Sequence, residues 1–224
     1  MLFKTETHLH MAETSSCSSI CAREFMERYR AAGYDTVFIT DHLRKRFFEE
    51  FETPEAAVKR FLLGYYNAKE AGEKLGLTVL MSAELNLGGN DHLLYGITEE
   101  FLAQVPLLND MTPEQLFDVA NANGVKIIAA HPFREKRIPN KDLIHGIEVV
   151  NGSYNHYHHN NNDKALALAE QMPHLWRTSG SDAHHPMDTG RGGIISKVKI
   201  ESSEDYINVL KSGDYQLLDA GWPK

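Results

Sequence analysis

The stretch LFKTETHLH, residues 2–10, has the alternating apolar and polar pattern of a short strand and ends in two histidines, His8 and His10. Side chains at positions i and i+2 of a strand point to the same side, so this pair can aim two imidazoles into one cavity. A single His-x-His pair is weak evidence for a metal site. The rest of the chain decides whether these histidines have partners.

Strands and helices alternate along the whole chain. Further strands are expected at residues 35–40, 77–87, 92–97, 125–133, 146–151, 175–185 and 192–200, and helices at residues 19–32, 53–76, 112–124, 163–172 and 203–215. Thr53 and Thr112, each followed by proline, are typical helix starts, and Gly33 is a typical helix stop. This alternation predicts an α/β fold of parallel βαβ units. About seven such units favour a barrel over an open sheet.

The length and composition of the chain limit the classes of function that it can have. The 224 residues fit one domain, residues 1–224, and the apolar fraction of 42% suffices for an ordinary core. The net charge of −8 disfavours nucleic-acid binding through a basic surface, although a nucleotide or oligonucleotide could still be a substrate. With no signal peptide, no apolar run of membrane-spanning length and only two cysteines, we expect a cytoplasmic protein that does not bind membranes. No Gly-x-Gly-x-x-Gly follows the first strand, which disfavours a dinucleotide fold.

The twelve histidines are the most unusual feature of the composition, and several of them fall at the ends of expected strands. Residues of metal-ligating type in such positions are His8, His10, Asp41, His42, Glu84, His92, His131, Asp182 and His184. In a parallel α/β barrel the chemistry is assembled at the carboxyl ends of the strands, so these side chains are expected on one rim. Together they predict a catalytic metal site with nitrogen and carboxylate ligands, too many for a single tetrahedral ion.

These motifs resemble the PHP superfamily, named for polymerase and histidinol phosphatase domains. The resemblance rests on ETHLH, FITDH, SAE, HLLYG, AHPFR and SGSDAHH, which span residues 6–185 in the family's order. It implies a distorted (β/α)7 barrel, a trinuclear centre of zinc, manganese or iron at the carboxyl-end rim, and phosphoester hydrolysis.

The resemblance also implies a division of the ligands among the ions. The first ion is assigned His8, His10, Glu84 and Asp182; the second Glu84, His92 and His131; the third His42 and His184. Many family members carry a further third-site ligand five or six residues after the second histidine, where this chain has Ser15 and Ser16. Glu13, Cys17 or water remain as substitutes, so the centre is expected to hold two or three ions.

The predicted reaction is hydrolysis of a small phosphorylated molecule. Two ions about 3.5–4 Å apart can share a hydroxide that attacks phosphorus in line. Asp182 and His184 are expected to act in catalysis, with His184 or the third ion near the leaving alkoxide. Arg134 and Arg191 are expected to bind the phosphate, because a guanidinium matches phosphate geometry.

The motifs leave two other interpretations open. An amidohydrolase-type enzyme acting on C–N or C–O bonds also begins with His-x-His and ends with an aspartate, but often uses a bridging lysine where this chain has Glu84. A degenerate, non-enzymatic metal-binding module would have lost ligands, and only the Ser15/Ser16 position supports that. Asp41 is expected to orient its neighbours, and His156, His158 and His159 to be loop residues without ligand roles.

Overall fold

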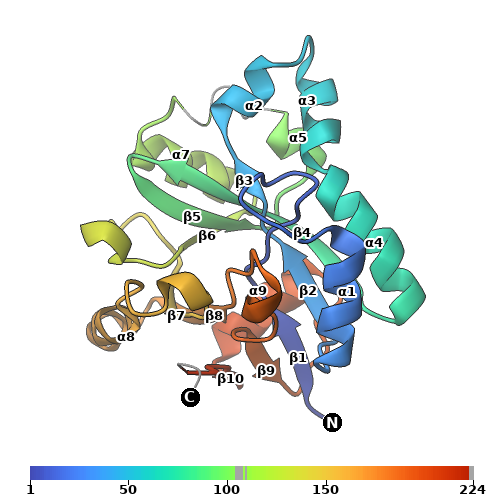
Figure 1. Cartoon of the computed structure of the whole chain (residues 1–224). Helices are drawn as coiled ribbons and strands as arrows, with labels where there is room; N and C mark the ends of the chain where they lie inside the picture. The colour runs from blue at the N-terminus through green and yellow to red at the C-terminus, as the bar shows by residue number, and fades with distance from the viewer. Residues whose placement is uncertain (104–107, 109, 222–224) are drawn as a thin grey trace.

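The computed structural model describes residues 1–103, 108 and 110–221. One mixed sheet curls through the molecule, in the order β10-β9-β1-β2-β4-β5-β6-β7-β8, with the short β3 paired to β4 (Figure 1). Its strands are β1 (Phe3–Glu6), β2 (Thr36–Ile39), β3 (His42–Leu43), β4 (Thr78–Leu87), β5 (Asn90–Tyr95), β6 (Lys126–Ala129), β7 (Gly146–Asn151), β8 (Trp176–Gly180), β9 (Ile194–Ser196) and β10 (Tyr215–Leu217).

The sheet nearly closes on itself. A parallel bridge joins Leu9, beyond the end of β1, to Ala183, beyond the end of β8. Next to this junction Gly192 packs against the backbone of Gly180, where a Cβ would lie only 2.1 Å from the carbonyl carbon. The expected distorted barrel is therefore confirmed, and its closure places residues 8–10 beside residues 182–184.

The strands are not all parallel, which differs from the sequence-based expectation. β4 and β5 pair antiparallel, as do β5 and β6, β1 and β9, and β9 and β10. The link from β4 to β5 is only Gly88-Gly89, with φ of 60° and 80°. Two residues with positive φ form a hairpin turn, whereas a parallel crossover needs a dozen or more residues. The strand β10 was not expected from the sequence.

Helices pack against the sheet, most of them on its outer face, whereas the last helix packs against residues of the inner face. They are α1 (Ala22–Ala31), α2 (Lys45–Glu49), α3 (Pro54–Phe61), α4 (Leu63–Leu75), α5 (Glu99–Leu102), α7 (Pro113–Ala122), α8 (Asn162–Gln171) and α9 (Ser203–Ser212). Both expected caps are present: the Thr53 side chain accepts a bond from Ala56 N, and Thr112 forms a reciprocal capping box with Gln115. The long helix expected over residues 53–76 divides at Leu62. Among these described helices, none is long and apolar enough to span a membrane.

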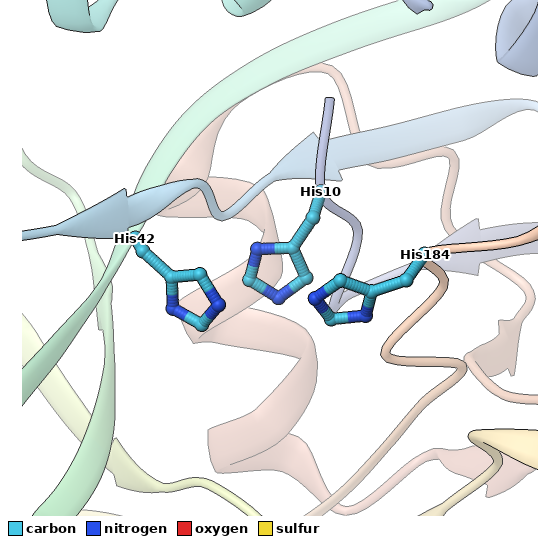
Figure 2. Close-up of side chains that lie close together, drawn as sticks. All are labelled: His10, His42 and His184. Atoms are coloured by element: carbon cyan, nitrogen blue, oxygen red, sulfur yellow. The ribbon is translucent and has the colours of Figure 1, made fainter. Parts of the chain in front are cut away.

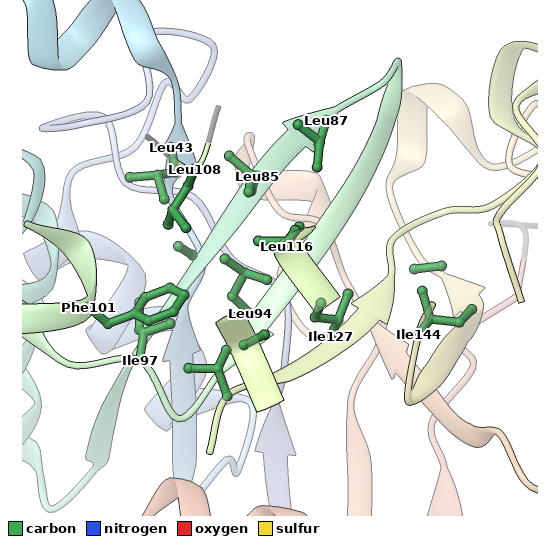
Figure 3. Close-up of a cluster of buried hydrophobic side chains, with 14 of the residues drawn as sticks. Leu43, Leu85, Leu87, Leu94, Ile97, Phe101, Leu108, Leu116, Ile127 and Ile144 are labelled. Atoms are coloured by element: carbon green, nitrogen blue, oxygen red, sulfur yellow. The ribbon is translucent and has the colours of Figure 1, made fainter. Parts of the chain in front are cut away.

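The largest apolar cluster fixes which way Glu84 points. Ala83, Leu85 and Leu87 of β4 pack with residues of α3, α5 and α7 in this cluster, on the outer face of the sheet (Figure 3). Because side chains alternate along a strand, Glu84 points to the opposite face, into the barrel. The packing of the core therefore directs the Glu84 carboxylate into the barrel at the carboxyl end of β4.

Candidate metal centre

Seven of the predicted ligands come together at the rim of the barrel. They form three overlapping groups: His8, His10 and Asp182; His8, Glu84 and His131; and His10, His42 and His184. Within each group one ligand atom of every member lies within 4.8 Å of the others. His8 and His10 follow β1, Glu84 lies on β4, and the remaining ligands lie on β3 or follow β6 and β8.

Glu84 lies between the groups. Its Oε1 is 2.9 Å from His131 Nε2 and 3.7 Å from His8 Nε2, while its Oε2 is 2.8 Å from His42 Nδ1 and 3.5 Å from His10 Nε2. Burial acts to raise the pKa of this carboxyl, but His42 and His8 outweigh burial and hold the pKa well below its usual range. An ionised carboxylate with histidines on both oxygens is suited to bridge two cations.

Glu148, a residue that the sequence motifs did not reveal, orients His8. Its Oε1 lies 2.9 Å from His8 Nδ1, and its Oε2 accepts bonds from His131 N and Asn151 Nδ2. A carboxylate bound to one ring nitrogen of a histidine fixes the tautomer and leaves the other nitrogen free for a metal. The only signal in the sequence is a charged residue in the otherwise apolar strand GIEVV, residues 146–150.

Asp182 and His10 form the next part of the centre. His10 Nε2 lies 3.3 Å from Asp182 Oδ1, and Asp182 Oδ2 accepts a 2.7 Å bond from Arg134 Nη2. Burial acts to raise the pKa of Asp182, but His8 and Arg134 hold it well below the usual range. Arg134 also donates to Asn160 and Asn151, so it is fixed beside this ligand.

The buried ligands carry polar atoms without partners, and this tests whether they fit a metal. Within the described residues, His8 Nε2, both ring nitrogens of His10, Glu84 Oε2 and His131 Nδ1 have no hydrogen-bond partner. Leaving such atoms unsatisfied away from water costs about 1–3 kcal/mol each. Divalent ions would satisfy them, and imidazole with carboxylate is a donor set that zinc, manganese and iron accept. The residues present therefore fit a site for divalent metal.

Two of these residues have unusual backbone angles. His131 has φ of 27° and Asp182 has φ of 49°, in the left-handed region that favours glycine. Such conformations cost about 1–3 kcal/mol each and persist where the surrounding structure enforces them, often at functional sites. Both angles occur directly where the chain leaves a barrel strand and turns across the rim.

The third group is more open than the others. Figure 2 shows the rings of His10, His42 and His184 converging from three separate segments. The ring centroid of His10 lies 4.4 Å from that of His42 and 4.3 Å from that of His184. The side chains of His42 and His184 are 21% and 17% exposed, whereas His8 is fully buried.

The segment after His10 is ordered around Asp41. Asp41 Oδ1 accepts bonds from Met11 N and from Ser15 Oγ, at 2.8 and 2.7 Å. Asp41 is thus placed where it orients the loop. Burial raises its pKa to about 7, although Ser15 and Met11 oppose this. Glu13 points elsewhere, because both of its carboxylate oxygens accept from Ala22 N at the start of α1.

His92 lies apart from the three groups. It pairs with Leu85 of β4 and Ala129 of β6, both core residues, whereas Glu84 pairs with Leu93. Directly paired residues share a face, so His92 lies on the face of the sheet opposite to Glu84. Asp91, its neighbour, faces the centre instead and lies 3.9 Å from His131 Nδ1.

Arg191 is also placed differently from the prediction. It is buried, its Nε donates to Gly152 O at 2.6 Å, and its guanidinium lies over the rings of Tyr154 and Tyr157. These contacts tie two loops together. Arg191 does not border the cavity described next.

A cavity of about 320 Å³ opens onto the centre. Ligands on its wall include His42, His131, Asp182 and His184. The wall also carries Arg44, Arg134 and Arg137, and of these only Arg134 was expected from the sequence. Arg137 is ion-paired with Asp91, while Arg44 is exposed. The cavity therefore combines a metal-ligand floor with three arginines on its wall, two of which are ion-paired with carboxylates of the same wall.

Comparison with known proteins gives structural likeness only. No family model matches the chain, and no curated protein matches it in sequence. A two-domain protein from Bacteroides vulgatus with a predicted PHP-like metal-dependent phosphoesterase has a TM-score of 0.71 at 16% identity, over 98% of this chain and 65% of that chain. The chain thus spans about two thirds of that protein.

Two further structures match over nearly their full lengths. A protein from Bifidobacterium adolescentis, described as a candidate metal-dependent phosphoesterase, has a TM-score of 0.56 at 14% identity, over 93% of this chain and 95% of that chain. An amidohydrolase from Chromobacterium violaceum, with bound sulfate and no metal, also has a TM-score of 0.56 at 14% identity, over 97% of this chain and 98% of that one. The chain therefore shares the fold of these three proteins, in agreement with the distorted barrel that the sequence motifs predicted.

Proposed function

We propose that the protein is a metal-dependent phosphoester hydrolase acting on a small phosphorylated molecule. The observation that carries this proposal is the convergence of seven nitrogen and carboxylate ligands, the buried Glu84 among them, at the floor of a cavity whose wall includes arginines. Phosphate esters are anionic, so their hydrolysis needs cationic partners and an activated water. The arginines can provide the cationic partners, and metal ions held by the ligands can activate a water.

The chain's own residues would hold and orient the ions. His8, His10 and Asp182 would hold one ion, Glu84 and His131 would hold a second, and Glu84 would bridge the two. Divalent ions held in this way supply a hydroxide nucleophile near neutral pH and polarise a phosphoryl oxygen. Glu148 keeps the free nitrogen of His8 directed at the centre, since its carboxylate holds the other one.

The residues on the cavity wall are assigned different roles. Arg134 is a positioning residue, because its Nη2 is bonded to Asp182, and its charge faces the same cavity. Arg44 is exposed on the wall, where a substrate phosphate would enter. His184 lies on the wall beside Asp182, and we assign it to the side of the leaving group, where His184 or an ion that it holds would stabilise the departing alkoxide.

An amidohydrolase-type activity on C–N or C–O bonds is the second candidate. The likeness to the Chromobacterium violaceum amidohydrolase is the observation in its favour. Against it stand the bridging position of Glu84 and the arginines of the cavity, which suit an anionic phosphoester better than a neutral amide.

The test begins with metal analysis of the purified chain. Protein loaded with manganese, zinc or iron is then assayed for phosphate release from a panel of phosphoesters that includes p-nitrophenyl phosphate, in parallel with carboxylic esters and cyclic amides. We expect metal-dependent phosphate release that is lost in metal-free protein. Hydrolysis of amides or esters alone, by protein that has bound metal, would favour the second candidate and contradict the first.

A further inference from the structure

The group formed by His10, His42 and His184 is short of ligands. His10 is fully buried, neither of its ring nitrogens has a partner within the described residues, and its ring faces those of His42 and His184 (Figure 2). His10 is also close to Asp182, and His42 is close to Glu84, so both are shared with the other two groups. An ion at this place needs at least one further protein ligand if it is to be held as firmly as its neighbours.

The loop that follows His10 offers few free donors. Ser15 donates to Asp41, and Glu13 caps the amino end of α1. Thr14 Oγ1 donates to Phe61 O and accepts from Gly64 N, so it holds the loop against α3 and α4. The side chains of these residues therefore already hydrogen-bond to other parts of the protein.

Cys17 is placed differently. It borders the cavity together with His42 and His184. The residue is exposed and lies at the edge of the three-histidine group, outside the set of atoms that already converge. Cys17 is thus exposed at the cavity wall, whereas His10 is fully buried.

We propose that the Cys17 thiolate, with His42 and His184, binds the third metal ion of the centre. The inference rests on the proposed metal centre and adds a soft ligand to a set that otherwise consists of nitrogen and oxygen. Binding would displace the thiol proton into solvent, so no oxidant or reductant is involved. Thiolate ligation favours zinc or cobalt over manganese and magnesium, so this position would differ in metal preference from the two ions around Glu84.

Cobalt(II) provides a readout that is independent of activity. The full-length chain, freed of metal and titrated with cobalt(II), should develop the near-ultraviolet charge-transfer absorption of a cobalt–thiolate bond. We expect this absorption in the unchanged protein and in Cys21→Ser, and its loss in Cys17→Ser, with one cobalt fewer bound per chain. Cys21 is a matched control because it is also an exposed thiol, lies four residues away and does not border the cavity.

Alkylation gives a second measurement on the same samples. Metal loading should protect Cys17 from iodoacetamide while Cys21 stays reactive, which peptide mass spectrometry would show. The far-ultraviolet circular dichroism of Cys17→Ser should match that of the unchanged protein, because an exposed thiol is replaced by a hydroxyl of similar size.

The outcomes separate this inference from the proposed function. A charge-transfer band that persists in Cys17→Ser, or bound cobalt with neither a band nor protection of Cys17, would overturn the thiolate ligand. A Cys17-dependent band in a protein that hydrolyses no phosphoester would leave the ligand standing and remove the function. Failure to bind any cobalt would contradict both.

Discussion

The two halves of the candidate centre are built differently. The inner cluster consists of His8, Glu84, His131 and Asp182, all nearly inaccessible to solvent, and the outer cluster consists of His42, His184 and Cys17 at the cavity wall. Two inner ligands are held by a further polar group, His8 by Glu148 and Asp182 by Arg134. The outer residues are partly exposed and make fewer such bonds.

This difference indicates that the two clusters bind metal in different ways. Buried ligands with fixed tautomers are organised before an ion arrives, so little freedom is lost on binding. Exposed ligands have to be ordered by the ion, which weakens binding and makes it sensitive to ligand type. The inner cluster is therefore expected to set activity, and the outer cluster to set metal selectivity and leaving-group chemistry.

The largest effect is expected from the ligands that link the groups. His10→Ala and Asp182→Ala should each reduce phosphoester hydrolysis to the uncatalysed level, because His10 lies beside both Glu84 and Asp182, and Asp182 lies beside both His8 and His10, so each change removes a shared ligand. Steady-state assays with saturating metal measure this. His159→Ala serves as the control and should keep full activity; the reverse pattern would overturn the assignment of the site.

A smaller effect is expected from the residue that only orients a ligand. Glu148→Gln should weaken metal binding by about 10- to 100-fold while leaving the fold intact, because the neutral amide holds the His8 ring less firmly than the carboxylate does. Metal-competition titration gives the affinity, and Glu170→Gln, an exposed residue of α8, is the matched control. Unchanged affinity in Glu148→Gln would show that the inner cluster does not depend on this support.

Stepwise metal removal compares the clusters directly. With increasing chelator, the ion of the outer cluster should leave first, because its ligands are more exposed to solvent. Elemental analysis of the protein at each chelator concentration follows the loss. Simultaneous release of all ions would contradict the distinction between the clusters.

A separate effect, on folding stability and not on metal binding, is expected at the buried Glu6. Burial raises the pKa of Glu6 to about 7 from 4.5, although backbone bonds from Ser181 and His8 oppose this. The folded state then holds a proton that the unfolded state loses, so stability falls as pH rises from 4.5 to 7, by about 3 kcal/mol.

Glu6→Gln should remove this fall. Its amide oxygen can still accept the bonds that Glu6 Oε1 receives from Thr7 N, His8 N and Ser181 N. Urea unfolding of metal-free protein on either side of this pH interval measures the difference between the two proteins. Parallel pH dependence in both would show that Glu6 does not titrate as its burial implies.

The sequence predicted the barrel and most of the centre because strand ends are marked in the chain. His8, His10, Glu84, His131, Asp182 and His184 all occur where an apolar strand pattern stops or nears its end, and such positions meet on one rim in any α/β barrel. The caps at Thr53 and Thr112 were predictable for a similar reason, since helix starts depend on local hydrogen bonds.

Other features of the site depend on strand register and on contacts between distant segments, and only the tertiary structure shows them. The two-glycine hairpin after β4 reverses β5, so Asp91 and not His92 faces the centre. Glu148 meets His8 across 140 residues of sequence, and Arg191 turns to the carbonyl of Gly152. A side chain's type and periodicity are local properties that the sequence displays, whereas its face and its partners follow from strand pairing and barrel closure, which involve the whole chain.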